Sequence, residues 1–222
     1  MSMSRYVIVC EGKSEWTYLQ RLKGFLDDQA VDQGAYLPAL QLIGPYNAVA
    51  KGGRFGTLKQ QYKATCKTER NKAGFIRIWA DFDLYLRNDK NNATAYKSKG
   101  ASGIPHFHFS FHNFEDFYAL HLDDASFQRW IAFGQQSRSG RQSHFAWPFH
   151  SEEYLQEFRR IVPDYRKGEI PSDFVSWTSL NNLRRNKSSC PKGAILTSLP
   201  GAGCFAEFLT EKLCNSYPKE MP

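Results

Sequence analysis

Residues 5–19, RYVIVCEGKSEWTYL, join a short apolar run to a helical pattern through an acidic residue and a glycine. The run at residues 5–10 is short and rich in β-branched side chains, which is typical of a buried strand in a parallel sheet. Apolar side chains then recur at helical spacing, and Ser14 is the expected N-cap of that helix. Glu11 therefore stands at the carboxyl end of a predicted strand, just before a helix.

A second stretch, FIRIWADFDLY at residues 75–85, repeats this arrangement with two aspartates. Its apolar part predicts a strand over residues 74–80, which Asp81 and Asp83 follow. Residues two apart in extended backbone project on the same side, so the two aspartates are expected to share a face. Because ligands of an open α/β sheet bind outside the carboxyl ends of its strands, we expect Glu11 to lie close to both aspartates.

The elements between these two stretches complete a β-α-β-α-β order. A strand is predicted over residues 39–43, and residues 50–72 are typical of a glycine-rich loop followed by a basic helix. This order predicts right-handed crossovers and a parallel sheet. The expected fold class is α/β, with a parallel, Rossmann-like sheet flanked by helices and a partly helical C-terminal half.

The chain beyond residue 85 is less regular. Residues 104–111 alternate between phenylalanine and histidine or serine, which predicts a fourth strand. A helix is expected to begin in NFEDFYALHL, and further helices are expected at residues 127–133, 152–161 and 206–213. The remaining C-terminal stretch, including residues 184–187, is expected to be rich in loops.

Composition and charge narrow the class of protein. Of the 222 residues, 41% are hydrophobic and 15% aromatic, which favours one folded unit over disorder. We expect a core over residues 1–125 and a C-terminal extension of helices and loops over residues 126–222, packed on that core.

The net charge of +7 favours polyanionic partners. The five cysteines form no CxxC pair, and no apolar run reaches bilayer length. We expect a soluble, cytoplasmic protein with no membrane partner.

The acidic residues point to a metal site. Carboxylates brought together repel one another unless a cation lies between them. Mg²⁺ takes oxygen ligands from one or two carboxylates, with water and phosphate completing its shell. Glu11, Asp81 and Asp83 therefore indicate a Mg²⁺ or Mn²⁺ site for phosphoryl transfer. Glu15 can face the same crevice, or it can simply balance the positive end of its helix; the sequence leaves both interpretations open.

These motifs together resemble those of TOPRIM domains, in which one strand is followed by EG and another, two βα units later, by DxD. CEGKSEWTYL at residues 10–19, IWADFDLY at 78–85 and HFSFHNFEDFYALHL at 108–122 are similar to the RloB-like branch of that group, which is related to OLD-type nucleases. The resemblance covers most of the chain. It is clearest up to about residue 122 and weak in PDYRKGEIP at 163–171.

The resemblance implies a metal-dependent nuclease centre. Glu11 would be a general acid or base or a metal ligand, and Asp81 and Asp83 would hold Mg²⁺. Glu15 would match the second acid of an EGxxE motif, and Glu115 would match the glutamate of a short FE segment. A third aspartate of the fuller pattern is replaced by a tyrosine here, so the number of metals stays open.

Several basic residues are candidates for phosphate contacts. Lys13 and Lys167 would assist catalysis or bind phosphate, or they are ordinary surface lysines. A stripe on the basic helix could follow a phosphate backbone, or it could be a solvated helix face. The stripe consists of Lys59, Lys63, Lys67 and Arg70. The HxH pair at residues 106–108 lacks the further ligands that zinc needs.

The sequence therefore predicts Mg²⁺-dependent hydrolysis of phosphodiester bonds in DNA or RNA. The resemblance places this activity in bacterial defence against phage, as in abortive infection. One alternative is a nucleic-acid-binding or regulatory module with a degenerate site, which works with a partner ATPase or restriction complex. Another is a phosphohydrolase that acts on a nucleotide.

Overall fold

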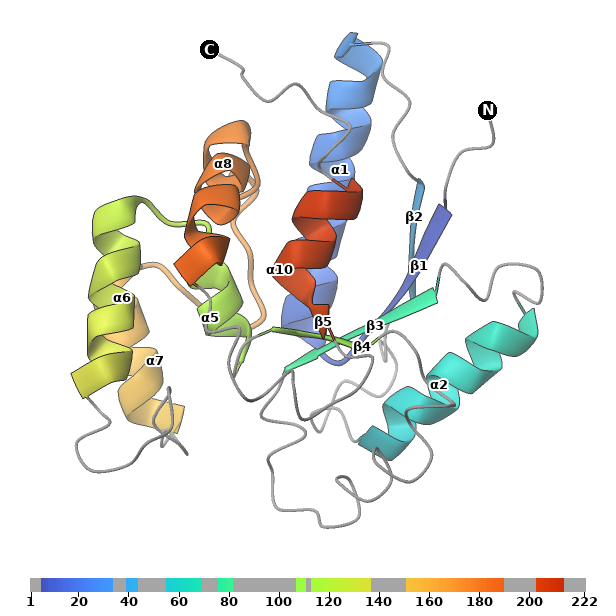
Figure 1. Ribbon diagram of the computed structural model, residues 1–222, viewed down its shortest axis with the longest axis horizontal. Coiled ribbons are helices and arrows are strands. Elements are labelled where there is room, and N and C mark those ends of the chain that lie inside the picture. Colours follow the sequence, from blue (N-terminus) through green and yellow to red (C-terminus); the bar gives the residue numbers. More distant parts are fainter. Residues whose placement is uncertain are drawn as a thin grey trace.

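The computed structural model describes residues 5–33, 39–43, 55–68, 76–81, 107–110, 113–136, 151–189 and 203–213. Within these residues a five-stranded sheet is flanked by helices, so the fold is α/β as expected (Figure 1). The strands are β1 (Arg5–Cys10), β2 (Ala39–Ile43), β3 (Ile76–Asp81), β4 (Phe107–Ser110) and the two-residue β5 (Gly203–Cys204). Every pairing between them is parallel.

The strand order is β2-β1-β3-β4-β5. The chain moves outward from β1 to β2 and then returns past β1 to β3, so its direction of winding reverses between β1 and β3. The crevice at such a reversal is where open α/β sheets bind ligands. The register pairs Cys10 with Trp79, and the backbone N–H of Glu11 donates to the carbonyl of Trp79 at 3.0 Å. Glu11 and Asp81 therefore reach the same edge of the sheet at this crevice.

Helices cover both faces of the sheet. Figure 1 shows α1 (Lys13–Gln33) and α10 (Phe205–Phe208) on one side of the strands and α2 (Phe55–Thr68) on the other. Alternation along the strands explains this arrangement. Ile8 and Trp79 face the first layer and join its hydrophobic core, whereas Ile76 and Ile78 point to the other face and are fully buried.

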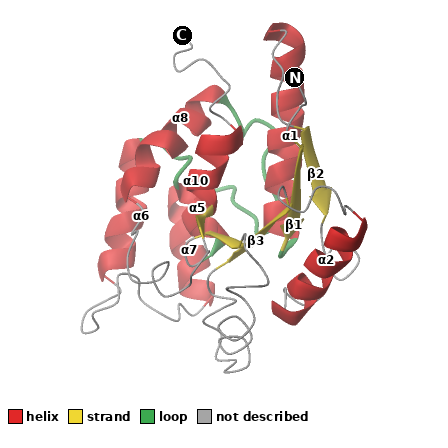
Figure 2. Ribbon diagram, turned by 45° about the vertical axis from the view of Figure 1, so that its right-hand side comes forward, coloured by secondary structure: helices red, strands yellow, loops and turns green. Residues whose placement is uncertain are grey.

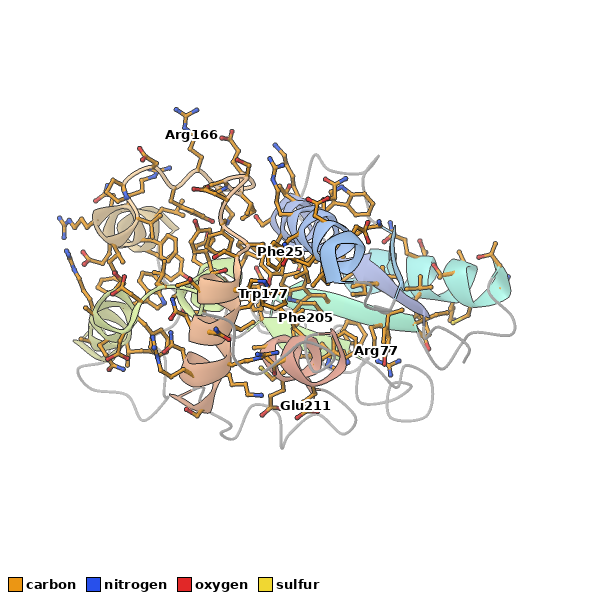
Figure 3. The ribbon with its side chains drawn as sticks, turned by 90° about the horizontal axis from the view of Figure 1, so that it is seen from above. Phe25, Arg77, Arg166, Trp177, Phe205 and Glu211 are labelled. Atoms are coloured by element: carbon orange, nitrogen blue, oxygen red, sulfur yellow. The ribbon has the colours of Figure 1, made fainter. Side chains whose placement is uncertain are left out.

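The core on the face of α1 and α10 is built from aromatic rings. Trp79 of β3 stacks on Phe205 of α10, with ring centroids 3.8 Å apart and planes within 6°. Phe117 packs edge-on against Trp79 at 4.9 Å. Toward the outer part of this layer, Phe25 packs against Trp177 at 5.2 Å, as Figure 3 shows. The ring of Trp177 therefore packs against the hydrophobic core.

Four further helices form a group beside the sheet (Figure 2). They are α5 (Phe114–Ala119), α6 (Asp124–Gln136), α7 (Ser151–Ile161) and α8 (Trp177–Asn186), the last followed by a 3₁₀ turn at Lys187–Ser189. One hydrophobic core cluster runs from Ile8 in the sheet to Phe158 of α7 and Leu183 of α8. None of the described helices combines the length and the apolar character that a membrane span requires.

The structure differs from the sequence-based expectations at three elements. Helix α1 begins at Lys13, so Ser14 lies inside the helix, and the carbonyl of Gly12 accepts the first helical hydrogen bond, from Trp16. Residues 184–186, expected in a loop, lie in α8, which Ser176 caps through a capping box with Ser179. The final helical segment is preceded by β5, and it continues from α10 into a π-helical turn at Leu209–Leu213.

Candidate functional site

Two of the predicted site residues meet at the crevice between β1 and β3. The carboxylate of Glu11 accepts a hydrogen bond from the backbone N–H of Asp81, at 2.8 Å from Oε2. Glu11 is buried, with 7% of its surface exposed, and Oδ1 of Asp81 is shielded from solvent. Adjacent parallel strands thus bring the Glu11 carboxylate to the backbone of Asp81. Asp83 lies outside the described residues.

Two more predicted acids are buried beside them. Glu15 stands in the first turn of α1 and Glu115 in the first turn of α5, and they are 3% and 1% exposed. Burial raises the pKa of Glu15 to about 7, and the negative charge of Glu115 acts in the same direction. Burial likewise raises the pKa of Glu115 above its usual value. Both pKa shifts arise because a charged carboxylate loses its hydration in this interior.

The glycine of the EG motif makes room for Glu15. A Cβ at Gly12 would lie 3.0 Å from Oε2 of Glu15, closer than real Cβ contacts normally come. The absence of a side chain at residue 12 lets the Glu15 carboxylate approach the backbone where β1 turns into α1. The spacing of acid, glycine and second acid therefore has a steric reason in this fold.

Lys167 supplies a positive charge to the buried acids. Its ammonium group opposes the rise in pKa of both Glu15 and Glu115, so it lies within electrostatic reach of both. The side chain is itself exposed, in the turn that follows α7. Its neighbour Arg166 projects outward from the same turn in Figure 3. An exposed lysine beside buried carboxylates is well placed to meet an anionic ligand.

The turn that carries Lys167 is hydrogen-bonded to the N-terminal part of α1. The Thr17 hydroxyl donates to the carbonyl of Gly168 at 3.3 Å, and Nε of Arg21 donates to the carbonyl of Ile170 at 3.3 Å. Gly168 has a φ of +81°, and a Cβ there would lie 3.2 Å from Cδ of Lys13. The close contact brings Lys13, from the N-terminal half, next to the turn that holds Lys167.

Tyr165 is hydrogen-bonded to one of the buried acids. Its hydroxyl donates to Oε1 of Glu115 at 2.7 Å. Burial raises the pKa of Tyr165, and the charges of Glu115 and Asp81 raise it further. Tyr165 therefore contacts Glu115 directly and lies within electrostatic reach of Asp81. Tyr165 was not among the predicted site residues, since its bond to Glu115 spans 50 residues of sequence.

The basic stripe on α2 occupies a different part of the molecule. Lys63 and Lys67 are exposed on α2, which both a phosphate-binding stripe and a solvated helix face require. However, Glu11 and Asp81 lie at the carboxyl ends of β1 and β3, whereas α2 precedes β3 in the chain and ends at Thr68. The side chain of Lys59 is not among those described, and Arg70 lies outside the described residues.

The donor set suits a hard cation better than zinc. No group of three or more histidine, cysteine or acidic side chains in the described part of the chain is arranged to hold a metal ion. Glu11 and Asp81 provide two carboxylates, which with water and phosphate are enough for Mg²⁺. The ring of His108 instead packs against Phe208 at 4.6 Å, while His106 lies outside the described residues. His121 is buried and packs against the ring of Phe117 at 5.3 Å.

The fold and site together define an open, parallel α/β protein with buried acids and a nearby lysine close to its topological switch point. Comparison with protein-family models, with curated proteins and with solved structures gives no match. The resemblance to TOPRIM domains consequently stays a prediction from the motifs.

Proposed function

We propose that this protein is a Mg²⁺-dependent nuclease that hydrolyses phosphodiester bonds at the crevice between β1 and β3. Two observations support the proposal: the Glu11 carboxylate meets the backbone of Asp81, and Glu15 and Glu115 are buried within electrostatic reach of each other and of Lys167. Buried acids and one exposed cation near a switch point are the residue types that metal-assisted phosphoryl transfer uses. The TOPRIM-like motifs support the same activity, and its place in anti-phage defence is part of this proposal.

Each residue then has a distinct task. Glu11 and Asp81 would hold Mg²⁺, which when bound supplies positive charge to the scissile phosphate. Lys167 would bind the phosphate from the solvent side and stabilise the charge that develops on its oxygens. Glu15, with a pKa of about 7, can hold or release a proton near neutral pH, which suits a general acid or base.

The first test is metal-dependent cleavage by the purified full chain. Wild type, Glu11→Ala and Asp81→Ala would be incubated with single- and double-stranded DNA and RNA, with Mg²⁺, Mn²⁺ or a chelator. We expect cleavage by wild type to require the metal, and each variant to lose activity by about a hundredfold or more. Asp124→Ala, at an exposed acid of α6, is the matched control and should cleave like wild type.

Other outcomes would decide between function classes. If wild type cuts nothing but binds nucleic acid without metal, and both variants bind equally well, the protein is a binding module with a degenerate site. Turnover of small nucleotides without cleavage of polymers would instead identify a phosphohydrolase. Circular dichroism spectra of all variants, matched to wild type, would show that lost activity does not reflect unfolding.

A further inference from the structure

The first turn of α5 is bound by three buried aromatic side chains from the C-terminal half. The bonds are Tyr154 Oη to Asn113 Oδ1, Tyr165 Oη to Glu115 Oε1 at 2.7 Å, and Trp130 Nε1 to Asp116 Oδ1 at 2.9 Å. Each donor is 4% exposed or less. Helix α6, helix α7 and the turn after α7 therefore each contribute one donor to the same helical turn.

Two of these bonds have a structural explanation. Asn113 is the N-cap of α5, and its side chain also accepts from the backbone N–H of Asp116 at 3.1 Å. The indole of Trp130 satisfies the buried carboxylate of Asp116, which would otherwise lose its hydration without compensation. The bond from Tyr165 differs, because its acceptor, Glu115, interacts electrostatically with Glu15 and Lys167 in the candidate site.

The ring of Tyr165 is held firmly by its surroundings. It packs edge-on against Phe158 at 4.7 Å and against Tyr118 at 5.3 Å. Its backbone N–H donates to Val162 at 3.0 Å, and its carbonyl accepts from Nε of Arg159 at 3.3 Å. With ring and backbone both fixed, the hydroxyl has a defined position before any ligand binds, which is how supporting residues preorganise a site.

We propose that Tyr165 is a positioning residue of this site, whose hydroxyl fixes the orientation of the Glu115 carboxylate near Glu15 and Lys167. The bond takes up part of the acceptor capacity of Oε1 and leaves the rest of the carboxylate for a metal ion, a proton or substrate. It also makes the acidic site depend on a residue of the C-terminal half. The catalytic consequence of this role rests on the proposed nuclease function.

The test removes the hydroxyl and keeps the ring. Tyr165→Phe would be compared with Tyr118→Phe, which deletes a hydroxyl from another buried tyrosine that packs against the same rings. We expect Tyr165→Phe to lower kcat about tenfold with KM unchanged, as loss of a supporting hydrogen bond to a functional side chain typically does. Tyr118→Phe should keep kcat within about twofold, since its hydroxyl has no such role. The Tm of both variants serves as the measure of a general loss of stability.

Crystal structures of wild type and Tyr165→Phe complete the experiment. A turned Glu115 carboxylate in the variant supports the proposal, and an unchanged carboxylate overturns it. Equal kcat values for the two variants would also overturn it. If wild type cleaves no nucleic acid, the proposed function fails, while the orientation of Glu115 in the two crystal structures still decides the positioning role.

Discussion

At the scale of single residues, the site is built from carboxyl groups that the fold has removed from water. Glu15 is 3% exposed, and its pKa of about 7 compares with 4.5 for an unperturbed glutamate. The folded state therefore holds a proton on Glu15 at a pH where the unfolded chain has already lost it. A group of this kind makes stability depend on pH, in a direction opposite to that of an ion-paired acid.

Substitution of Glu15 should reveal this dependence directly. In metal-free buffer, wild type should lose stability as the pH rises from 4.5 to about 7. In this range the carboxyl of Glu15 ionises in the unfolded chain but stays protonated in the folded protein, so rising pH favours unfolding. Glu15→Gln removes that penalty while keeping the shape of the side chain. We expect the variant to be more stable than wild type at pH 8 by up to about 3 kcal/mol, and nearly equal to it at pH 5. Urea denaturation at both pH values provides the measurement.

An exposed acid in the turn after α7 offers the control. Glu169→Gln should change the free energy of unfolding little, and equally at both pH values, since the side chain stays in water. A Glu15→Gln variant with the same stability increment at pH 5 and pH 8 would contradict a raised pKa. Its effect would then come from packing alone.

At the scale of elements, the turn after α7 depends on one backbone conformation. Gly168 has a φ of +81°, in the left-handed region that other residues rarely adopt, and it lies directly against Lys13 of α1. The turn brings Tyr165 to Glu115 and Lys167 within electrostatic reach of Glu15 and Glu115. A glycine here is therefore required both for the turn and for its contact with α1.

Gly168→Ala should consequently destabilise the protein. A non-glycine residue at this φ costs about 1–2 kcal/mol, and the added methyl group also displaces the side chain of Lys13. Gly24→Ala is the matched control, because a Cβ at that helical position meets no atom within 4 Å. It should instead stabilise α1 by about 1 kcal/mol. In thermal melts, we expect the Tm of Gly168→Ala to fall and that of Gly24→Ala to rise. An unchanged Tm for Gly168→Ala would refute the requirement for glycine at residue 168.

The elements that could be predicted from the sequence are those whose pattern is local. Strands β1, β2 and β3 are short apolar runs bounded by polar residues, and their predicted positions agree with the structure to within about two residues. Helix α8 could not be recognised in this way, since its buried apolar residues are only Leu180 and Leu183 and its cap is a serine pair. Strand β5 is two residues long and exists only through its pairing with β4.

The candidate site shows the same division. Glu11 and Asp81 were predictable because parallel strands end at one edge, and a strand followed by an acid is visible in the sequence. Tyr165 was not predictable, because no local pattern announces a hydrogen bond between a loop tyrosine and a helix 50 residues earlier. Candidate ligand-binding residues such as acids can be recognised in a sequence by their chemical type. A residue that orients such an acid can be recognised only from its contacts in the folded structure.

At the scale of the whole molecule, the two halves share a hydrophobic core. The boundary expected at residues 125 and 126 is crossed by the core cluster, which joins Trp79 of β3 to Phe205 of α10. Strand β5 extends the sheet from the C-terminal half by pairing with β4. The acidic site at one edge of the sheet and the helices that orient Glu115 should therefore form and unfold together.

Phe205 is the residue at which this cooperativity can be tested. Its ring is fully buried and stacks on Trp79 at 3.8 Å, so Phe205→Ala leaves a cavity between the sheet and α10. Such a substitution typically costs about 3–5 kcal/mol. We expect one urea transition, shifted to lower concentration and coincident by tryptophan fluorescence and circular dichroism. Phe133→Ala, at a partly buried ring of α6, should shift the same transition less.

Two separate transitions, with only one affected by Phe205→Ala, would mean that the halves fold independently. The C-terminal half would then be an appendage to the acidic site, and the bond from Tyr165 to Glu115 would join two units of separate stability.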